Sequence, residues 1–245
     1  MSAIIKYLVL ATLLASSAAA NAAIALDRTR IIFPGSEKSA SVNIANTNVR
    51  KPYLAQAWLE DMQGNKITSP FVVVPPVQRV EPDGKSTVRI NALPAVASLP
   101  QDRESVFMFN LREIPPKSDT PNTMQVALQS KIKLFYRPEA ILPERYARWD
   151  DQLVLHKVAG GYRIENPTPY YMNIIAVTGA EHEIVAKDFK PVMIDPKSSA
   201  TVKTKTFATP WVMTINDYGG KPILPYRCSG DTCHAYIPDS AHKQE

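Results

Sequence analysis

The stretch that most constrains the fold runs from residue 123 to residue 138, TMQVALQSKIKLFYRP. In its first half, Met124, Val126 and Leu128 alternate with small or polar residues. Alternation with period two is typical of a β-strand that has one apolar face. This half therefore predicts a strand that offers an apolar row to a partner.

The second half of the same stretch is almost continuously apolar or β-prone, but it contains Lys131 and Lys133. Pro138 ends it, because proline cannot donate a hydrogen bond to a neighbouring strand. The pattern predicts one strand over 123–138, longer than most strands of globular proteins, whose second half carries a cation inward. The alternative is an ordinary sandwich strand with two solvated lysines.

The rest of the chain also favours strands. It has 21 Pro and only 9 Gly, and its β-prone runs are short and bounded by proline and turn residues. The first set of predicted strands is 24–33, 39–44, 53–59, 71–74, 87–91, 106–112 and 123–138. The second set is 152–156, 162–165, 171–177, 192–194, 200–203 and 211–216. This spacing is expected of all-β, immunoglobulin-like sandwiches, and it predicts two domains with a cleft between them.

The start of the chain has the pattern of a secretory signal peptide. Lys6 is the only charge before Asp27, an apolar run follows it, and Ala20-Asn21-Ala22 fits the small-x-small cleavage rule. The apolar run is too short to span a bilayer. We therefore expect a signal peptide over residues 1–22, a first domain over 23–138, a linker over 139–144 and a second domain over 145–245.

Charge and motifs favour a binding protein over an enzyme. The formal net charge is +5, but the basic residues are dispersed, and no basic run with interleaved aromatic residues indicates nucleic acid. The sequence has no glycine-rich phosphate loop, no G-x-S-x-G and no H-E-x-x-H. It therefore predicts neither a nucleotide nor another cofactor.

The chain has two cysteines, Cys228 and Cys233. In an oxidising compartment so short a spacing predicts a disulfide that closes a short hairpin. The alternative is a metal site that also uses His234, but such a site needs a further ligand, and the other three histidines are scattered.

Eight segments carry a family resemblance. They are LDRTR (26–30), YLAQAWLED (53–61), PPVQRVEP (75–82), LPQDRES (99–105), FNLREIPP (109–116), QSKIKLFYRP (129–138), GGYRIENPTPYY (160–171) and INDYGG (215–220). Together they resemble the periplasmic pilus-assembly chaperones of the chaperone–usher pathway. The resemblance covers essentially the whole mature chain. It implies two immunoglobulin-like domains in an L-shaped arrangement, a periplasmic location and no need for nucleotide.

The resemblance also implies a mechanism. Such chaperones bind, fold and cap pilin subunits, which lack a strand and expose unpaired edges, by donor-strand complementation, and they deliver them to an outer-membrane usher. The donor row would be Met124, Val126 and Leu128. By motif, Arg30 and Lys133 would hold the C-terminal carboxylate of the pilin in the interdomain cleft. Self-association of the free chaperone is left open.

Strict alternation conflicts with part of this assignment. Lys133 has the parity opposite to that of Met124, Val126 and Leu128. A bulge, a strong twist or a cleft that wraps around the strand would be needed. Lys131 is the alternative carboxylate ligand.

Two further expectations concern structure. Glu104, Arg137 and Asp217 match a salt-bridge network that ties the two domains together in the resembled family. Pro75-Pro76 is a place for a cis bond, although base rates favour trans.

An exported structural β-sandwich, such as a pilin-like or adhesin-like subunit, is the alternative function. It disagrees with the two domains and with a mature chain that enters a strand at Ile24.

Overall fold

The computed structural model describes residues 22–118, 120–144 and 147–237. The predicted signal peptide, residues 1–22, therefore lies outside the described residues except for Ala22. No helix in the described part of the chain has the length and apolarity needed to span a bilayer. The chain forms strands joined by loops and three short 3₁₀ turns, η1 (Pro94–Ser98), η2 (Glu139–Ile141) and η3 (Asp150–Gln152).

The first ten strands build two facing sheets. They are β1 (Ile24–Leu26), β2 (Arg30–Pro34), β3 (Ser39–Asn46), β4 (Tyr53–Glu60), β5 (Lys66–Ile67), β6 (Phe71–Val74), β7 (Val77–Val80), β8 (Lys85–Ala92), β9 (Ser105–Ile114) and β10 (Gln129–Arg137). One sheet has the order β1-β3-β8-β6, and the other has the order β2-β10-β9-β4-β5 with β7 also on β4. This is a sandwich, as the strand spacing predicts.

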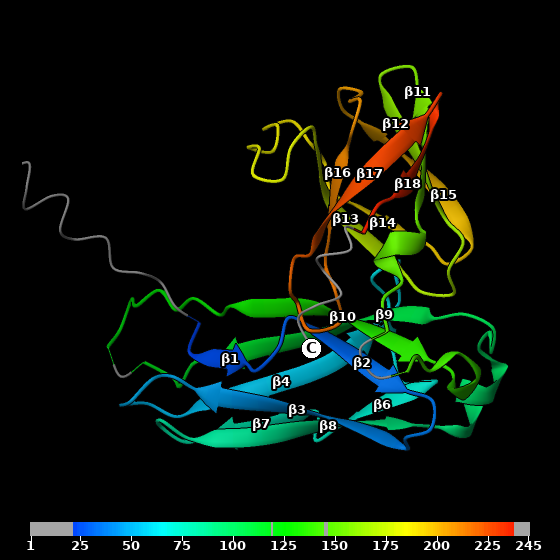
Figure 1. Cartoon of the computed structure of the whole chain (residues 1–245). Coiled ribbons are helices and arrows are strands. Elements are labelled where there is room, and N and C mark those ends of the chain that lie inside the picture. Colours follow the sequence, from blue (N-terminus) through cyan, green and yellow to red (C-terminus); the bar gives the residue numbers. More distant parts are fainter. Residues whose placement is uncertain (1–21, 119, 145–146, 238–245) are drawn as a thin grey trace, which may run out of the picture.

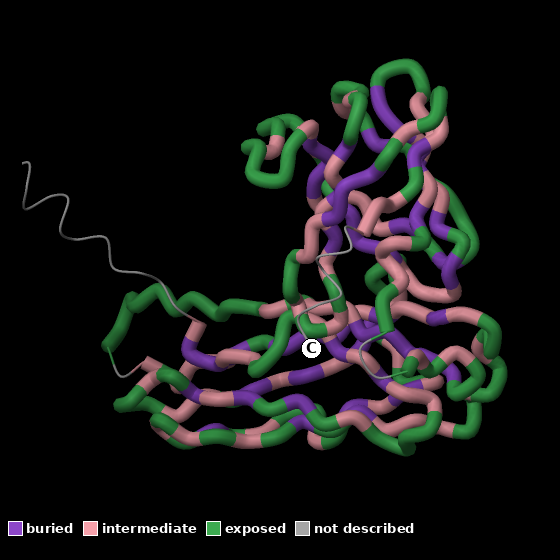
Figure 2. The backbone as a smooth tube through the Cα atoms, viewed as in Figure 1, coloured by how far each residue is buried: buried purple, intermediate pink, exposed green. Residues whose placement is uncertain are grey.

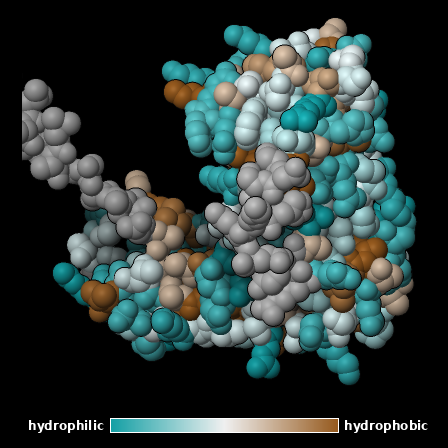
Figure 3. All heavy atoms as spheres, in the orientation of Figure 1, coloured by the Kyte–Doolittle hydropathy of each residue, from teal (hydrophilic) through white to brown (hydrophobic). Residues whose placement is uncertain are grey.

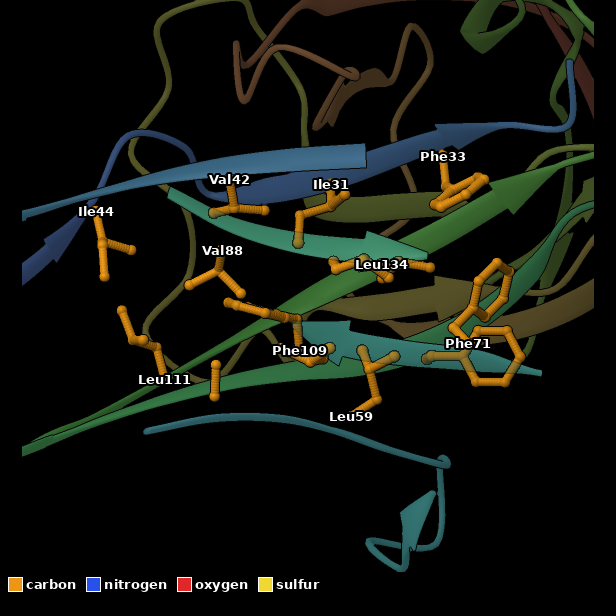
Figure 4. Packing of buried hydrophobic residues seen from close by; sticks show 14 of the residues in the cluster. Ile31, Phe33, Val42, Ile44, Leu59, Phe71, Val88, Phe109, Leu111 and Leu134 are labelled. Carbon is orange, nitrogen blue, oxygen red and sulfur yellow. The ribbon is translucent and has the colours of Figure 1, made fainter. Parts of the chain in front are cut away.

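Alternate residues of these strands fill the space between the two sheets. Phe33, Phe71, Phe109 and Leu134 are fully buried there (Figure 4). The rings of Phe33 and Phe71 lie 5.0 Å apart in a tilted arrangement, which aromatic pairs favour. The first domain therefore has its own core, and the opposite parity of each strand is free for other contacts.

The last eight strands build the second domain. They are β11 (Val154–Val158), β12 (Gly161–Asn166), β13 (Met172–Thr178), β14 (Val192–Ile194), β15 (Ser198–Lys203), β16 (Trp211–Thr214), β17 (Ile223–Ser229) and β18 (Thr232–Ala235). Their order is β14-β13-β16-β17-β18-β11-β12-β15. β17 pairs with β16 through its first residues and with β18 through its last ones, so it joins two layers. Tyr162 and Tyr226 are fully buried between those layers.

The two domains meet at one end of the first, and together they have the shape of an L (Figure 1). Buried segments run along the strands of both domains (Figure 2). At the junction the Glu104 amide donates to the Pro169 carbonyl at 2.9 Å, and the Tyr170 hydroxyl donates to the Ile141 carbonyl at 2.7 Å. Figure 3 shows hydrophobic residues at the surface near the far, left end of the first domain.

Two strand predictions are wrong. The predicted strand 24–33 is two strands in different sheets, separated by residues 27–29, where Asp27 and Arg28 pair with each other at 2.8 Å. The predicted strand 123–138 begins only at Gln129, because residues 123–128 have no strand partner. The predictions also omitted β5 and β7, and they gave no strand bounds for β17 and β18, which form the short hairpin predicted from the two cysteines. The Val74–Pro75 peptide bond is cis, as is Ser69–Pro70, so the trans expectation for Pro75 is wrong.

Candidate functional site

Two cations lie side by side where the domains meet. Arg30 is the first residue of β2, and Lys133 is its register partner on β10 in a parallel pairing. Register partners on adjacent strands point to the same face of a sheet. Ile31 and Leu134, the next pair, are buried in the core, so Arg30 and Lys133 point away from it.

Both cations reach the second domain. The Lys133 Nζ donates to the Asn173 Oδ1 at 2.8 Å, and the Arg30 Nη1 donates to the Ile215 carbonyl at 3.2 Å. Within the described residues, neither forms an ion pair, and the buried Arg30 Nε has no hydrogen-bond partner. A buried donor without an acceptor is costly, and an anion bound beside Arg30 would supply the missing acceptor.

The electrostatics agree with this view. Burial lowers the pKa of Lys133, and the positive charge of Arg30 lowers it further. Burial also lowers the pKa of Arg30, and the Asp217 carboxylate partly offsets that effect. A bound anion would raise both pKa values, because it favours the charged forms.

A pocket of about 410 Å³ adjoins Arg30. Its lining is Asp27, Arg28, Thr29, Arg30, Ile32, Asp217 and Tyr218, and Lys133 is not part of it. The turn before Gly220 closes one side, since a Cβ on Gly219 would lie 2.6 Å from the Thr29 Oγ1. The Asn216 Oδ1 organises this turn by accepting from the amides of Tyr218 and Gly220. The pocket is therefore formed by both domains.

Lys131 shares the face of Lys133 but is engaged within the first domain. Its Nζ lies 2.6 Å from the Glu60 Oε2, and the Trp58 Nε1 donates to the Glu60 Oε1 at 2.7 Å. The hydrogen bond from Lys131 lowers the pKa of Glu60. Lys131 therefore has an anion of its own, whereas Lys133 has none in the described part of the chain.

The conflict of parity resolves without a bulge. β10 pairs with β9 in unbroken register from Gln129 to Tyr136. Leu134 and Tyr136 belong to the core, whereas Lys133 and Arg137 contact the second domain. Even positions thus face the core and odd positions face the cleft. The cation that β10 was predicted to carry inward, Lys133, is half-buried and directed toward the second domain, not into the core of its own sandwich.

The apolar row precedes β10 and is exposed. Met124 is 89% exposed, Val126 65% and Leu128 38%. Apart from the Leu128 carbonyl, which accepts from the Glu113 amide at 3.0 Å, the row shows no strand pairing in the described residues. The row has the even numbering of the core-facing residues of β10, but it lies outside that strand, which begins at Gln129. It offers an apolar face that no other described residue covers.

Glu104, Arg137 and Asp217 lie together at the domain junction. Arg137 contacts the Glu104 Oε1 at 2.6 Å and the Asp217 Oδ2 at 2.8 Å. Its guanidinium also lies 5.1 Å from the ring centroid of Trp149 and 4.8 Å from that of Tyr170. Burial raises the pKa of Glu104 against the opposing effect of Arg137. Burial alone would lower the pKa of Arg137, but its two carboxylate partners raise it.

Comparison with known proteins identifies the family. The family described as "Pili and flagellar-assembly chaperone, PapD N-terminal domain" matches residues 23–142, and "Pili assembly chaperone PapD, C-terminal domain" matches residues 148–225. The chain belongs to the PapD family of pilus-assembly chaperones. This is a family of chaperones and not of enzymes.

Individual relatives and solved structures support this family assignment. The chaperone is 54% identical over 215 residues to Chaperone protein PapD of Escherichia coli, an alignment that covers 87% of this chain and 90% of the relative. The crystal structure of the CupB2 chaperone of Pseudomonas aeruginosa matches with a TM-score of 0.70 and 32% identity, covering 84% of this chain and 100% of that one. The periplasmic chaperone SfaE matches with a TM-score of 0.68 and 29% identity, covering 82% and 98%.

The disulfide of the chaperone lies in the second domain, as predicted. Cys228 and Cys233 are register partners on β17 and β18, and their sulfur atoms are bonded to each other. Both thiols are consumed in this bond, so they are not metal ligands beside His234.

Sequence reasoning missed several groups of this site. Asn173, which accepts from Lys133, and Glu60, which pairs with Lys131, carry no local signal, because their partners are far away in sequence. Tyr170 lies in the segment 160–171, where two prolines and three tyrosines gather, and that clustering was an available signal. Trp149 follows the linker and was not singled out.

Proposed function

We propose that this protein is a periplasmic chaperone that binds, folds and caps pilin subunits by donor-strand complementation and delivers them to an outer-membrane usher. One observation carries the proposal. Arg30 and Lys133 are half-buried neighbours with no carboxylate partner in the described residues, and β10 joins them directly to an exposed, alternating apolar row.

The cations suit the terminal carboxylate of a client chain. A carboxylate has two oxygens and about four acceptor sites, and it can take hydrogen bonds from an ammonium and a guanidinium together. The unsatisfied Arg30 Nε would gain the acceptor that it lacks. Hydrogen bonds between charged partners are roughly twice as strong as neutral ones. The anchor therefore favours a chain end over an internal segment.

The apolar row suits a groove that lacks a strand. Lys133 lies five positions after Leu128, which is about 17 Å of extended chain. An anchored client end would thus meet the row at a fixed register, and a slip by one residue would turn every side chain to the wrong face. Backbone hydrogen bonds would supply affinity, and Met124, Val126 and Leu128 would fill pockets of the client.

Location and delivery follow from the same proposal. A cleaved signal peptide over residues 1–22 would place the mature chaperone in the periplasm, where the disulfide is stable. Usher delivery rests on membership of the family. The exposed row is also an edge on which free copies could associate, so we include self-association of the client-free chaperone in the proposal.

The experiment measures binding of a peptide that copies a pilin C-terminus, with a free carboxylate and with an amide. We expect Arg30→Ala and Lys133→Ala each to weaken binding of the free acid by a factor of about thirty to several thousand, since losing one cation costs about 2 to 5 kcal/mol. The two losses are not additive, because both act on one carboxylate.

Arg28→Ala and Lys131→Ala are the matched controls, since Arg28 pairs with Asp27 and Lys131 pairs with Glu60. Both variants should bind nearly normally. Equal binding of amide and acid would refute carboxylate anchoring. A loss with Lys131→Ala but not with Lys133→Ala would show that the assigned register is wrong. If the chaperone does not co-purify one-to-one with a pilin from the same cell, the alternative of an exported structural subunit gains support.

A further inference from the structure

Glu113 is an acidic residue on the core-facing parity of β9. It is the last but one residue of the strand, follows the buried Leu111 by two positions, and is only 6% exposed. Its register partner on β4, Ala55, is buried as well. Within the described residues no cation pairs with Glu113. A buried carboxylate without a cation is expensive, so this one calls for a partner.

The carboxylate of Glu113 joins two ends of the first domain. Its Oε2 accepts from the Ile24 amide at 3.0 Å, and its Oε1 accepts from the Leu128 amide at a longer 3.4 Å. The Glu113 amide also donates to the Leu128 carbonyl at 3.0 Å. Ile24 begins β1, and Leu128 is the last residue of the apolar row. Glu113 therefore ties the start of the first strand to the base of that row.

The position before Ile24 is where the sequence predicts processing. Ala23 is buried, and its carbonyl accepts from the Thr47 amide at 2.7 Å, so this end of the chain is held in place. Signal peptidase would hydrolyse the Ala22–Ala23 bond. Water is consumed, Ala22 keeps a carboxylate, and Ala23 gains an ammonium group. The nitrogen that becomes charged is one residue from the amide that Glu113 already binds.

We propose that Glu113 is the receptor for the α-ammonium group of Ala23, so that removal of the signal peptide supplies the missing cation and fixes the base of the donor row. The pairing depends on the export that the proposed function includes, but it does not depend on pilin. The unprocessed chain has a neutral peptide nitrogen at Ala23 and leaves Glu113 with neutral donors only. In the processed chain the ammonium group fixes the Glu113 carboxylate, so the hydrogen bond from the Leu128 amide is more stable. The base of the row is then fixed in position.

The test is amide hydrogen exchange of the client-free protein. Full mature chains that start at Ala23, at Ala22 and at Asn21 are released from a cleavable fusion, each with Glu113 and with Glu113→Gln. Starting at Asn21 moves the ammonium group by two residues, about 7 Å along the chain. Exchange is followed at Ile24 and Leu128, with Leu134 and Leu155 as reference amides in the two cores.

We expect exchange at Ile24 and Leu128 to be about tenfold or more faster in the chain that starts at Asn21 than in the one that starts at Ala23, because hydrogen bonds between charged partners are stronger than those between neutral ones. In the Glu113→Gln background, exchange at Ile24 and Leu128 should differ by less than about twofold between the chains that start at Ala23, Ala22 and Asn21. The reference amides should not change.

Equal exchange in the three chains with Glu113 overturns the proposal, and this comparison remains valid even if Glu113→Gln fails to fold. An equal acceleration in both backgrounds also overturns it, because that shows a steric effect of the added residues. Glu37→Gln, an exposed glutamate, is the matched control and should behave like the parent. Pilin capture is measured separately: lost capture with normal exchange would count against the donor row and not against this pairing.

Discussion

Replacing Arg137 by alanine is the sharpest test of how the two domains are held together. The Arg137 side chain is 4% exposed and pairs with Glu104, which is 2% exposed. Without Arg137 the Glu104 carboxylate stays buried with the Tyr171 amide, at 2.7 Å, as its remaining described donor. Breaking a buried pair on one side costs about 3 to 5 kcal/mol, and loss of the stacking on Trp149 is included in that range. We expect a loss of about 4 kcal/mol in the free energy of unfolding.

Matched variants separate the buried charge from simple truncation. Asp217→Ala should cost only roughly 1 kcal/mol, because the Asp217 side chain is 24% exposed and Arg137 keeps Glu104. Arg137→Lys keeps the charge but loses the planar fork that binds two carboxylates, so its cost should lie between the two. Adding Glu104→Gln to Arg137→Ala should recover part of the loss, since the buried site then holds no charge.

The loss of stability in Arg137→Ala should depend on pH in a definite direction, which the pKa of Glu104 sets. Burial raises the pKa of Glu104 above its ordinary value, and loss of Arg137 would raise that pKa further. A carboxyl group whose pKa is higher in the folded than in the unfolded state binds protons on folding. Stability therefore rises as the pH falls through the raised pKa, and the deficit of Arg137→Ala should shrink on acidification.

Urea unfolding of the parent and the variants at neutral and mildly acidic pH measures these differences in the free energy of unfolding. Trp58 reports on the first domain and Trp211 on the second, which matters because a two-domain chain need not unfold in one step. The reasoning is refuted if Arg137→Ala is no more costly than Asp217→Ala, or if its deficit is the same at both pH values.

Three further predictions concern the donor row, the disulfide and the cleft. Leu128→Glu should leave both domains folded by circular dichroism but abolish pilin capture in a pull-down, because a carboxylate would enter an apolar groove unpaired; an unfolded variant would place the row in the chaperone's own core. Cys228→Ser with Cys233→Ser should lower the stability of the second domain by about 2 kcal/mol in calorimetry, as expected for so short a loop. Gly219→Ala should cost at least about 1 to 2 kcal/mol, because its φ is +80° and its Cβ would meet Thr29; an unchanged melting temperature would contradict the close approach.

The sequence predicted those parts of the fold that depend on local pattern. Short β-prone runs bounded by prolines became β3, β4, β6, β8 and β9 within a few residues, and the spacing of the two cysteines predicted their hairpin. The polar residues Asp27, Arg28 and Thr29 interrupt the apolar pattern, but they do not show that the strand ends there, because distant pairing partners decide that β1 and β2 enter different sheets. β5 and β7 were missed for a similar reason, since each is defined by its pairing with β4.

In the candidate site, too, some features follow from the local sequence and others depend on distant segments. Arg30 and Lys133 were assigned by resemblance, and no local pattern distinguishes Lys133 from Lys131, which has the same parity. What distinguishes them is their neighbours. Glu60, two strands away from Lys131 in the sheet, neutralises it, whereas Lys133 meets the amide oxygen of Asn173. Such neighbours come from the packing of distant segments and are visible only in the folded chain.

Period two explains why one strand can serve several tasks. In β10 the even positions Leu134 and Tyr136 fill the core, and the odd positions Lys133 and Arg137 face the cleft and the domain junction. The exposed row before β10 has the same even numbering; if it extends the strand when a client binds, the face that enters the client groove continues the face that fills the chaperone's own core. Because Leu128 directly precedes β10, whose register is unbroken from Gln129 to Tyr136, the position of a client end at Lys133 would determine which client pocket lies over Leu128.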